Sequence, residues 1–353
     1  MKFLKYLLLL ILVVVVAGAV YFGAQDGKFD VAATKDLNIP QQLAFQTAED
    51  YQTWNKWGPW MKLDPEVQMN YGDTVSGMGA SYSWTSEVPE VGNGRMKTVG
   101  LAENESLDQK ITFESPLGDS ENDVYWRFEP GPDNTTRVTW GMKGEFGLME
   151  KVFMAFQSVP FEESMKTMYE EGLTNLENHV QEQMKAFNVS FDGIVEYGGG
   201  YYLYLTASSD KAGLSAKMGP MLGKVGAYMQ SNGLTPSGMP FTLYHQENED
   251  NGQMIFSTAM PIKEKVITAP ESEVLCGYIP PLTAIKVTLK GNYDHLEAAY
   301  DNALAYIEEK ALELDPENPK FEIYTTDPGL EPNPSKWITE IYIPIVPPTQ
   351  TIN

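Results

Sequence analysis

The second half of the chain contains an internal repeat, in which the order strand, helix, strand, loop, strand occurs twice. The first unit has these elements at 201–207, 212–230, 241–244 and 254–262. The second unit has them at 284–290, 293–309, 321–324 and 337–345. Both units carry Phe-x-x-Tyr on the third element and end in Pro-Ile. Two such units would be related by a pseudo-two-fold axis and would enclose a cleft where they meet, unless the short pattern has arisen by chance.

The segment 29–187 shows a different pattern, in which several strands precede one long helix. Strand-like runs lie at 80–85, 96–101, 107–114, 124–129 and 136–143. Trp126 and Phe128 share one face of their run, and a turn rich in Pro and Gly at 130–134 leads into the next run, which is typical of a hairpin. Apolar residues then recur at three- and four-residue steps over 161–184, which predicts an amphipathic helix. This order indicates an α+β domain whose antiparallel sheet curls round the helix.

An uncharged apolar run extends from Tyr6 to Ala24. As a helix with about 1.5 Å of rise per residue it reaches roughly 28 Å, close to the hydrocarbon thickness of a bilayer. Lys2 and Lys5 would stay in the cytoplasm, so the body would face the periplasm or the cell exterior. The small residues at 17–19 leave cleavage of a secretory signal, and a secreted body, as the alternative. We expect residues 6–24 to remain as a membrane anchor, because the apolar run continues past that site.

Charge and residue counts exclude several classes of function. The chain has 25 basic and 48 acidic residues, so its surface repels phosphate backbones, and no nucleic-acid partner is expected. A single cysteine, Cys276, excludes an intrachain disulfide and a multi-cysteine zinc site, and three histidines leave little for a histidine-rich site. The sequence also lacks a Gly-x-Ser-x-Gly elbow, a phosphate-binding loop and a His-Glu-x-x-His pair. We therefore expect no metal and no cofactor, and a binding protein more than an enzyme.

The second half resembles the gyrase-inhibitor-like (GyrI-like) effector-binding domain, which is also found in multidrug-responsive transcription activators. The matching pieces are 289–293, which open a helix, Tyr300 and Tyr306 along it, 324–328, and the run Trp-Ile-Thr-Glu-Ile-Tyr-Ile-Pro-Ile at 337–345. The resemblance covers about residues 190–346 and implies a duplicated β-α-β-β domain that binds small molecules. Those activators add a basic helix-turn-helix domain. This chain has an acidic body and an apolar anchor instead, so direct transcriptional control is not expected.

The first half is similar to the START-like, polyketide-cyclase-like (SRPBCC) superfamily over residues 29–184. The matching pieces are Ile39-Pro40 before a short helix, the aromatic run at 54–60, and the order of strands and long helix. The resemblance implies a helix-grip fold, in which a curved antiparallel sheet and a long C-terminal helix surround a cavity. The aromatic side chains that would either line this cavity or fill it are Trp84, Phe113, Trp126 and Trp140.

Glu340 is the candidate ligand-binding residue. Alternation along the last strand places Ile338, Glu340 and Tyr342 on one face and the residues between them on the other, beneath the helices. In the resembled family the Glu at this motif position lies in the binding pocket and meets cationic or polar ligands. A carboxylate among aromatic side chains is poorly solvated, so we expect a raised pKa for Glu340. A Glu on a solvated face, paired with a Lys, is the alternative.

Tyr324, Tyr342 and Tyr244 are expected to accompany Glu340, because Phe321 and Ile323 leave Tyr324 on the other face of its strand. Aromatic walls with orienting hydroxyls suit a small amphipathic or cationic molecule. The sequence thus predicts a membrane-tethered small-molecule-binding protein. Its ligand cleft surrounds Glu340, and a second apolar cavity lies in the N-terminal domain.

Two other functions stay open. One is a hydrolase of small electrophilic molecules, with Glu340 as general base and Tyr324 or Tyr342 as acid. The other is a structural or scaffold protein of the cell envelope with filled cavities, which a salt-bridged Glu340 without a cavity would favour. The expected domains are an anchor or signal segment at 1–25, a START-like domain at 26–187, a GyrI-like domain at 188–346 and a tail at 347–353.

Overall fold

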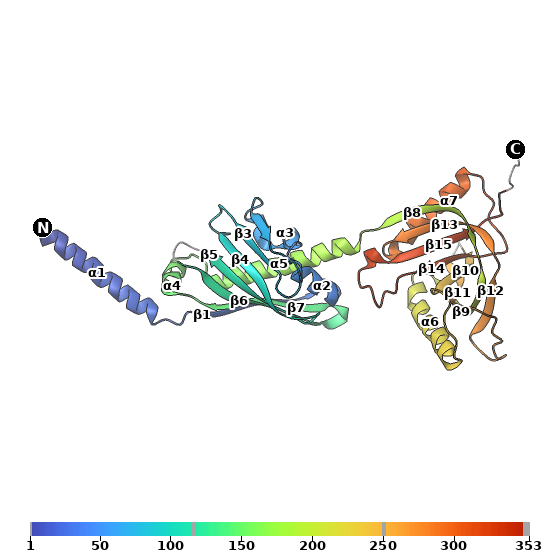
Figure 1. Cartoon of the computed structure of the whole chain (residues 1–353), viewed down its shortest axis with the longest axis horizontal. Coiled ribbons are helices and arrows are strands. Elements are labelled where there is room, and N and C mark those ends of the chain that lie inside the picture. Colours follow the sequence, from blue (N-terminus) through green and yellow to red (C-terminus); the bar gives the residue numbers. More distant parts are fainter. Residues whose placement is uncertain (1, 115–117, 249–251, 349–353) are drawn as a thin grey trace. The chain divides into compact units, whose positions relative to one another are not determined.

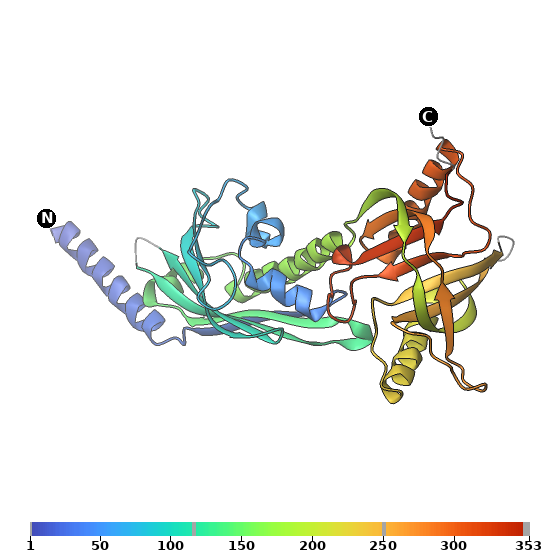
Figure 2. The same ribbon diagram turned by 45° about the vertical axis from the view of Figure 1, so that its right-hand side comes forward.

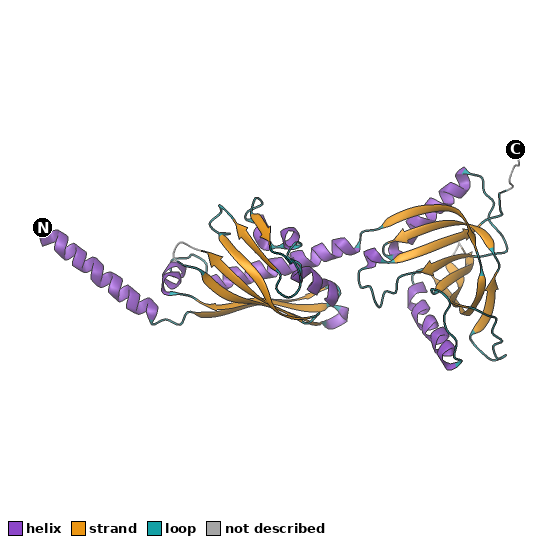
Figure 3. Ribbon diagram, viewed as in Figure 1, coloured by secondary structure: helices purple, strands orange, loops and turns teal. Residues whose placement is uncertain are grey.

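The structure, a computed structural model of the chain, describes residues 2–114, 118–248 and 252–348. The chain divides into two compact units between Gln183 and Met184, and each unit is described by itself. Figure 1 gives the element labels, and Figure 3 shows that each unit combines helices with a sheet. The fold is therefore of the mixed α and β class that the sequence predicts. From residue 349 onward, the predicted tail lies outside the described residues.

The first unit opens with α1 (Lys2–Gly23), a helix made largely of Leu and Val residues. Its segment Phe3–Gly23 has a mean hydropathy of 2.7, and the structure buries none of it. Within the described residues it is the one helix long and apolar enough to cross a membrane. A signal sequence near an N-terminus has the same length and composition.

Seven antiparallel strands form the sheet of the first unit, in the order β1-β7-β6-β5-β4-β3-β2. The strands are β1 (Lys28–Leu37), β2 (Gln68–Tyr71), β3 (Ser81–Thr85), β4 (Asn93–Ala102), β5 (Ser106–Glu114), β6 (Ser120–Pro130) and β7 (Thr136–Glu145). Strands β2 to β7 follow one another as a meander. β1 then pairs with β7 along its whole length, from Lys28 opposite Glu145 to Leu37 opposite Thr136.

The sheet bends around the long helix α5 (Phe161–Met184), which has the bounds that the sequence predicts (Figure 2). One stripe of α5 is buried, at Tyr169, Gly172, Leu173, Leu176 and Val180. The Tyr169 ring lies 4.6 Å from the Trp140 ring, centroid to centroid. A Cβ atom on Gly172 would lie 2.6 Å from the Trp140 ring, so the helix approaches the sheet too closely for a larger residue at this position.

Short helices fill the connections of the first unit. They are α2 (Gln41–Glu49), α3 (Trp54–Trp57), a 3-10 turn at Pro59–Lys62, a second at Pro132–Asn134, and α4 (Leu148–Met154). α2 and α3 are held by their aromatic residues, because Phe45 packs on Phe128, and Trp54 and Trp57 on Trp126.

Eight antiparallel strands form the sheet of the second unit, in the order β12-β9-β11-β10-β14-β15-β13-β8. The strands are β8 (Asn188–Tyr197), β9 (Gly200–Asp210), β10 (Phe241–Asn248), β11 (Gln253–Ile262), β12 (Leu275–Ile279), β13 (Leu282–Lys290), β14 (Lys320–Tyr324) and β15 (Ile338–Pro344). The helices are α6 (Leu214–Ser231) and α7 (Leu296–Glu309), with 3-10 turns at Tyr293–His295 and Pro334–Lys336.

The strand order follows the two repeats, β9-α6-β10-β11 and β13-α7-β14-β15. Their middle strands β10 and β14 pair at the centre, and the other strands follow outward in the same order on both sides. The strands that precede each unit are exchanged, because β8 pairs with β13 and β12 pairs with β9. A pseudo-two-fold relation requires this order, and the symmetry axis itself stays a prediction.

The two faces of this sheet are covered differently. α6 packs on β9 and β11, and α7 packs on β13, β8 and β15. The cores between helices and sheet include Leu203 of β9 beneath α6 and Ile341 of β15 beneath α7. The opposite face holds a cluster built from strand residues alone, including Tyr202, Phe321 and Tyr342. We call it the strand face.

Candidate functional site

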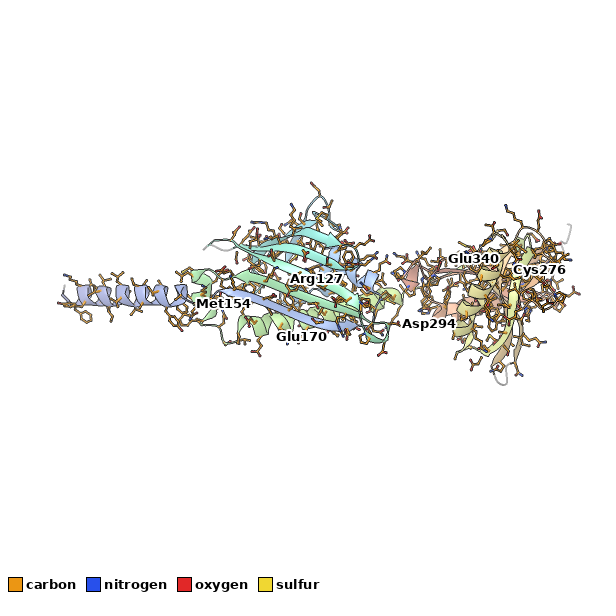
Figure 4. The ribbon with its side chains drawn as sticks, turned by 90° about the horizontal axis from the view of Figure 1, so that it is seen from below. Arg127, Met154, Glu170, Cys276, Asp294 and Glu340 are labelled. Atoms are coloured by element: carbon orange, nitrogen blue, oxygen red, sulfur yellow. The ribbon has the colours of Figure 1, made fainter. Side chains whose placement is uncertain are left out.

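β15 carries three of the five predicted site residues, Ile338, Glu340 and Tyr342, and strand parity turns them toward the strand face. Ile341 and Ile343 pack beneath α7, whereas Tyr342 joins the cluster of the strand face. Glu340 has the same parity as Tyr342, and Figure 4 labels it within the second unit. Ile338 is exposed at the start of the strand, opposite Lys290. The alternation read from the sequence therefore agrees with the packing of this strand.

Glu340 carries a partner on each carboxylate oxygen. Lys286 on β13 donates to Oε1 at 2.7 Å, and the Tyr342 hydroxyl donates to Oε2 at 3.0 Å. Asp192 on β8 lies 4.0 Å from the Lys286 ammonium. The side chains of Lys286, Glu340 and Asp192 are 21%, 26% and 30% exposed. Glu340 is therefore paired in the structure, because Lys286 on the neighbouring strand points to the same face of the sheet.

Three aromatic rings adjoin this ion pair. Phe321 and Tyr342 stack, with centroids 4.9 Å apart and planes inclined by 7°, and Tyr197 lies 4.9 Å from Phe321 and 5.2 Å from Tyr342. The Lys286 ammonium lies 5.6 Å from the centre of the Tyr342 ring, within the range of a cation–π contact. Burial, followed by the charge of Glu340, raises the pKa of the Tyr342 and Tyr197 hydroxyls.

Tyr324 and Tyr244 lie on the other face of the sheet, so the prediction that they accompany Glu340 is wrong. Both hydroxyls donate to Oε2 of Glu322, at 2.8 Å and 2.9 Å, and the Tyr300 hydroxyl of α7 donates to Oε1 at 2.8 Å. The physical reason is strand parity. Phe321 and Ile323 face the Glu340 side, which sends Glu322 and Tyr324 beneath the helices.

Glu322 is the residue that sequence reasoning missed. It is 2% exposed, and burial raises the pKa of its carboxyl, while the three tyrosine hydroxyls and the charge of Lys320 oppose that rise. The same cluster raises the pKa values of all three tyrosines, chiefly by burial. One feature of the sequence could have pointed to Glu322. It is a charged residue inside the short strand Phe-Glu-Ile-Tyr, at the position where the first repeat has Thr242.

Two surface hollows lie away from Glu340. One, of about 590 Å³, lies between α6 and β9, near the edge strand β12, and is lined by Leu205, Pro220, Met221 and the ion pair Lys224–Glu273. The other, of about 540 Å³, lies on the first unit and is lined by residues that include Tyr71, Arg95 and Lys97.

The interior of the first unit is packed with aromatic rings. Trp126 and Trp140 stack with centroids 4.2 Å apart, and Trp54 and Trp57 contact both of them. A polar chain runs through this core. Trp126 Nε1 donates to Gln109 at 3.1 Å, and Gln109 donates to the Tyr51 hydroxyl at 3.0 Å. Trp54, Trp57, Trp126 and Trp140 are all buried in this core, and whether these side chains line a cavity or fill it stays open.

The arrangement suits binding more than acid–base catalysis. The charge of Glu340 is matched by Lys286, and the raised pKa of Tyr342 makes it a weak proton donor near neutral pH. Tyr324, the alternative acid, lies on the wrong face. Among the described residues, no group of three His, Cys, Asp or Glu side chains is placed to hold a metal ion.

Comparison with known proteins finds a matching family for each half of the chain. Residues 28–181 match the family of polyketide cyclases, dehydrases and lipid transport proteins, and residues 202–346 match the GyrI-like small-molecule-binding domain. The two domains occur in the order that the sequence predicts. No curated protein matches the chain.

Several solved structures are similar to parts of the chain. The C-terminal domain of EcmrR is 22% identical, and the match covers 45% of this chain and 98% of that one, with a TM-score of 0.39. EcmrR in its complex with DNA is 18% identical, with coverage of 62% and 88% and a TM-score of 0.39. The protein MLL2253 from Mesorhizobium loti is 12% identical, with coverage of 44% and 98% and a TM-score of 0.32.

Proposed function

We propose that this protein, a polyketide-cyclase-like domain followed by a GyrI-like small-molecule-binding domain, is a membrane-tethered binder of small amphipathic cations. The second domain supplies the ligand site on its strand face, around Glu340, Tyr342 and Tyr197. The single observation that carries the proposal is the half-buried Lys286–Glu340 pair beside three packed aromatic rings.

The position of Lys286 supports a cationic ligand, because its ammonium already contacts the two groups that such a ligand would need, a carboxylate and an aromatic ring. It donates to Glu340 at 2.7 Å and lies 5.6 Å from the centre of the Tyr342 ring. A cation with apolar or aromatic surface that packed against these rings would take the place of the ammonium and would gain the same carboxylate. Lys286 is therefore an internal competitor for the ligand. Tyr324, Tyr244 and Glu322 belong to the opposite face and have no part in this site.

The tether is supported by α1. Its apolar segment Phe3–Gly23 is about 30 Å long as a helix, which matches a bilayer core. The chain after this helix has 23 basic and 48 acidic residues, because Lys2 and Lys5, two of the 25 basic residues, belong to α1. Such a body is not held to anionic lipid by charge, so attachment depends on apolar contacts.

Binding of tetraphenylphosphonium, compared with neutral triphenylphosphine oxide, tests the ligand class in the full chain. Lys286→Met should tighten binding of the cation about tenfold, which corresponds to about 1.4 kcal/mol, because the competitor is removed. Glu340→Gln should weaken cation binding by a similar factor and leave the neutral compound unaffected. Lys290→Met, an exposed lysine on the same strand, is the matched control. Equal effects of both Lys variants, or no preference for the cation, would refute the proposal.

A structural role in the cell envelope is the second candidate. The aromatic core of the first domain favours it, because its closely packed rings leave less room for a ligand there. The paired Glu340 is consistent with it as well. If neither probe binds and Glu340→Gln changes only the unfolding temperature, this candidate replaces the first.

A further inference from the structure

The segment around α4 exposes large apolar side chains at the end of the first unit that adjoins α1. The exposed residues are Leu148, Met149, Phe153, Phe156 and Val159. Phe153 and Phe156 are 61% and 83% exposed. The chain has no charged residue between Lys151 and Glu162. A contiguous exposed apolar patch of this kind usually marks a surface that meets another apolar phase.

Covalent geometry and hydrogen bonds fix this segment beside the end of the apolar helix. α1 ends at Gly23, and β1 begins at Lys28, so only four residues separate the two. The Lys151 side chain of α4 donates to the Gln25 carbonyl at 2.7 Å, and the Phe146 amide donates to the Gly27 carbonyl at 2.9 Å. Figure 4 labels Met154, the last residue of α4, at this end of the unit.

The base of the segment is anchored in the fold. Phe146 stacks on Phe29 of β1 at 4.6 Å, and Phe161 of α5 meets each of them edge-on at 5.0 Å. These rings attach both ends of the 146–161 segment to the sheet and the long helix. The apolar side chains between them therefore remain on the outside, although the segment itself is held in place.

We propose that the 148–159 segment inserts its apolar side chains into the lipid interface next to α1 and holds the first domain against the bilayer. The inference rests on the proposed tether, because a membrane-spanning α1 brings Gln25, and with it α4, to the membrane surface. Lipid is the occupant that this position selects, since the patch is continuous with the end of the span. A short amphipathic segment of Phe, Leu and Met residues beside a span is a common interfacial anchor.

The test measures how deeply single labels lie in phosphatidylcholine vesicles that contain the full chain. Cys276 is first replaced by Ser, and an environment-sensitive fluorophore is then attached in turn through Phe156→Cys, Val14→Cys and Glu103→Cys. Position 14 lies in α1. Position 103 lies in an exposed turn between β4 and β5, at the end of the sheet far from α4. The ten-residue strand β1 runs from one end of the sheet to the other, so the two ends are about 30 Å apart. Nitroxide-bearing lipids should quench the labels at 14 and 156 severalfold more than the label at 103.

The outcomes separate this inference from the tether. Quenching at 14 without quenching at 156 overturns the lipid-facing segment and leaves the tether intact. Absence of quenching at 14 overturns both, and equal quenching at 103 and 156 overturns the orientation. Phe153→Asp should reduce quenching at 156 severalfold, since a carboxylate resists burial in lipid, whereas Phe153→Leu should preserve it. Unchanged quenching in the Asp variant would also refute the inference.

Discussion

Glu322 and Glu340 lie on neighbouring strands and face opposite sides of one sheet, and their surroundings give them different properties. Glu340 keeps contact with water and balances its charge against Lys286. Glu322 has lost almost all contact with water, and its carboxylate depends on three tyrosine hydroxyls. A buried charge without an ion-pair partner is costly, and hydrogen bonds together with the more distant charge of Lys320 offset only part of that cost. The raised pKa of Glu322 expresses this balance.

Glu322→Gln should therefore change how stability depends on pH. The carboxyl of the folded chain has a pKa above its ordinary value of 4.5, so the unfolded chain releases this proton at a lower pH. Between 4.5 and the folded pKa the unfolded state binds fewer protons, and the free energy of unfolding falls as pH rises through that window. The variant lacks this loss, so its stability relative to the native chain should increase above pH 4.5. Denaturant unfolding of both chains across this window measures the difference.

Two substitutions complete this experiment. Glu340→Gln is the control, because its half-exposed side chain lies on the opposite face, and it should not reproduce the trend. Glu322→Ala should destabilise the fold by about 3 kcal/mol or more, since it leaves three buried hydroxyls without an acceptor. A constant difference between native and Gln chains at every pH would contradict the argument.

At the scale of elements, the sequence predicted the strands and helices that have a clear hydrophobic period, and it missed strands that are defined mainly by pairing with a neighbour. The meander from β3 to β7, helix α5 and both repeat units follow from alternation and three- to four-residue spacing. β8 and β12 were not predicted. They are edge strands, and each becomes a strand by pairing with one neighbour, β8 with β13 and β12 with β9. Glu340 was proposed as a site residue from a motif, whereas its ion-pair partner Lys286 could not be predicted, because that pairing depends on the register between two strands.

The close contact of α5 with the sheet leads to a prediction about Gly172. Alanine is a better helix former than glycine by about 1 kcal/mol. At this position, however, its Cβ would lie 2.6 Å from the fully buried Trp140 ring and 3.2 Å from Pro59. Gly172→Ala should therefore lower the free energy of unfolding by roughly 1–3 kcal/mol through overpacking. Gly223→Ala in α6 is the matched control, because nothing lies within 4 Å of its Cβ position, and it should be neutral or stabilising. Tryptophan fluorescence in urea reports on the first variant, and a stabilised Gly172→Ala chain would disprove the close contact.

At the scale of the whole molecule, the fate of α1 decides whether the two domains act at a membrane or in solution. Its composition suits both an anchor and a signal, and the small residues at 17–19 offer a cleavage site. The first domain argues for retention, since Lys151 and Phe146 bond to Gln25 and Gly27, within four residues of the end of α1. A chain cut after residue 19 would leave Val20, Tyr21 and Phe22 as a free apolar end beside the exposed α4 segment.

We therefore expect the chain from a membrane-targeting host to keep its first 25 residues and to stay in the pellet after an alkaline carbonate wash. Intact mass spectrometry of the pelleted chain checks the N-terminus directly. Leu substitutions at Ala17 and Ala19, which remove the small residues that cleavage needs, should leave the N-terminus and the location unchanged, so that the intact mass differs only by the two substitutions. If the native chain is instead soluble and begins at Val20, while the Leu variant is retained in the membrane, α1 is a signal sequence. The ligand site around Glu340 would then belong to a secreted protein.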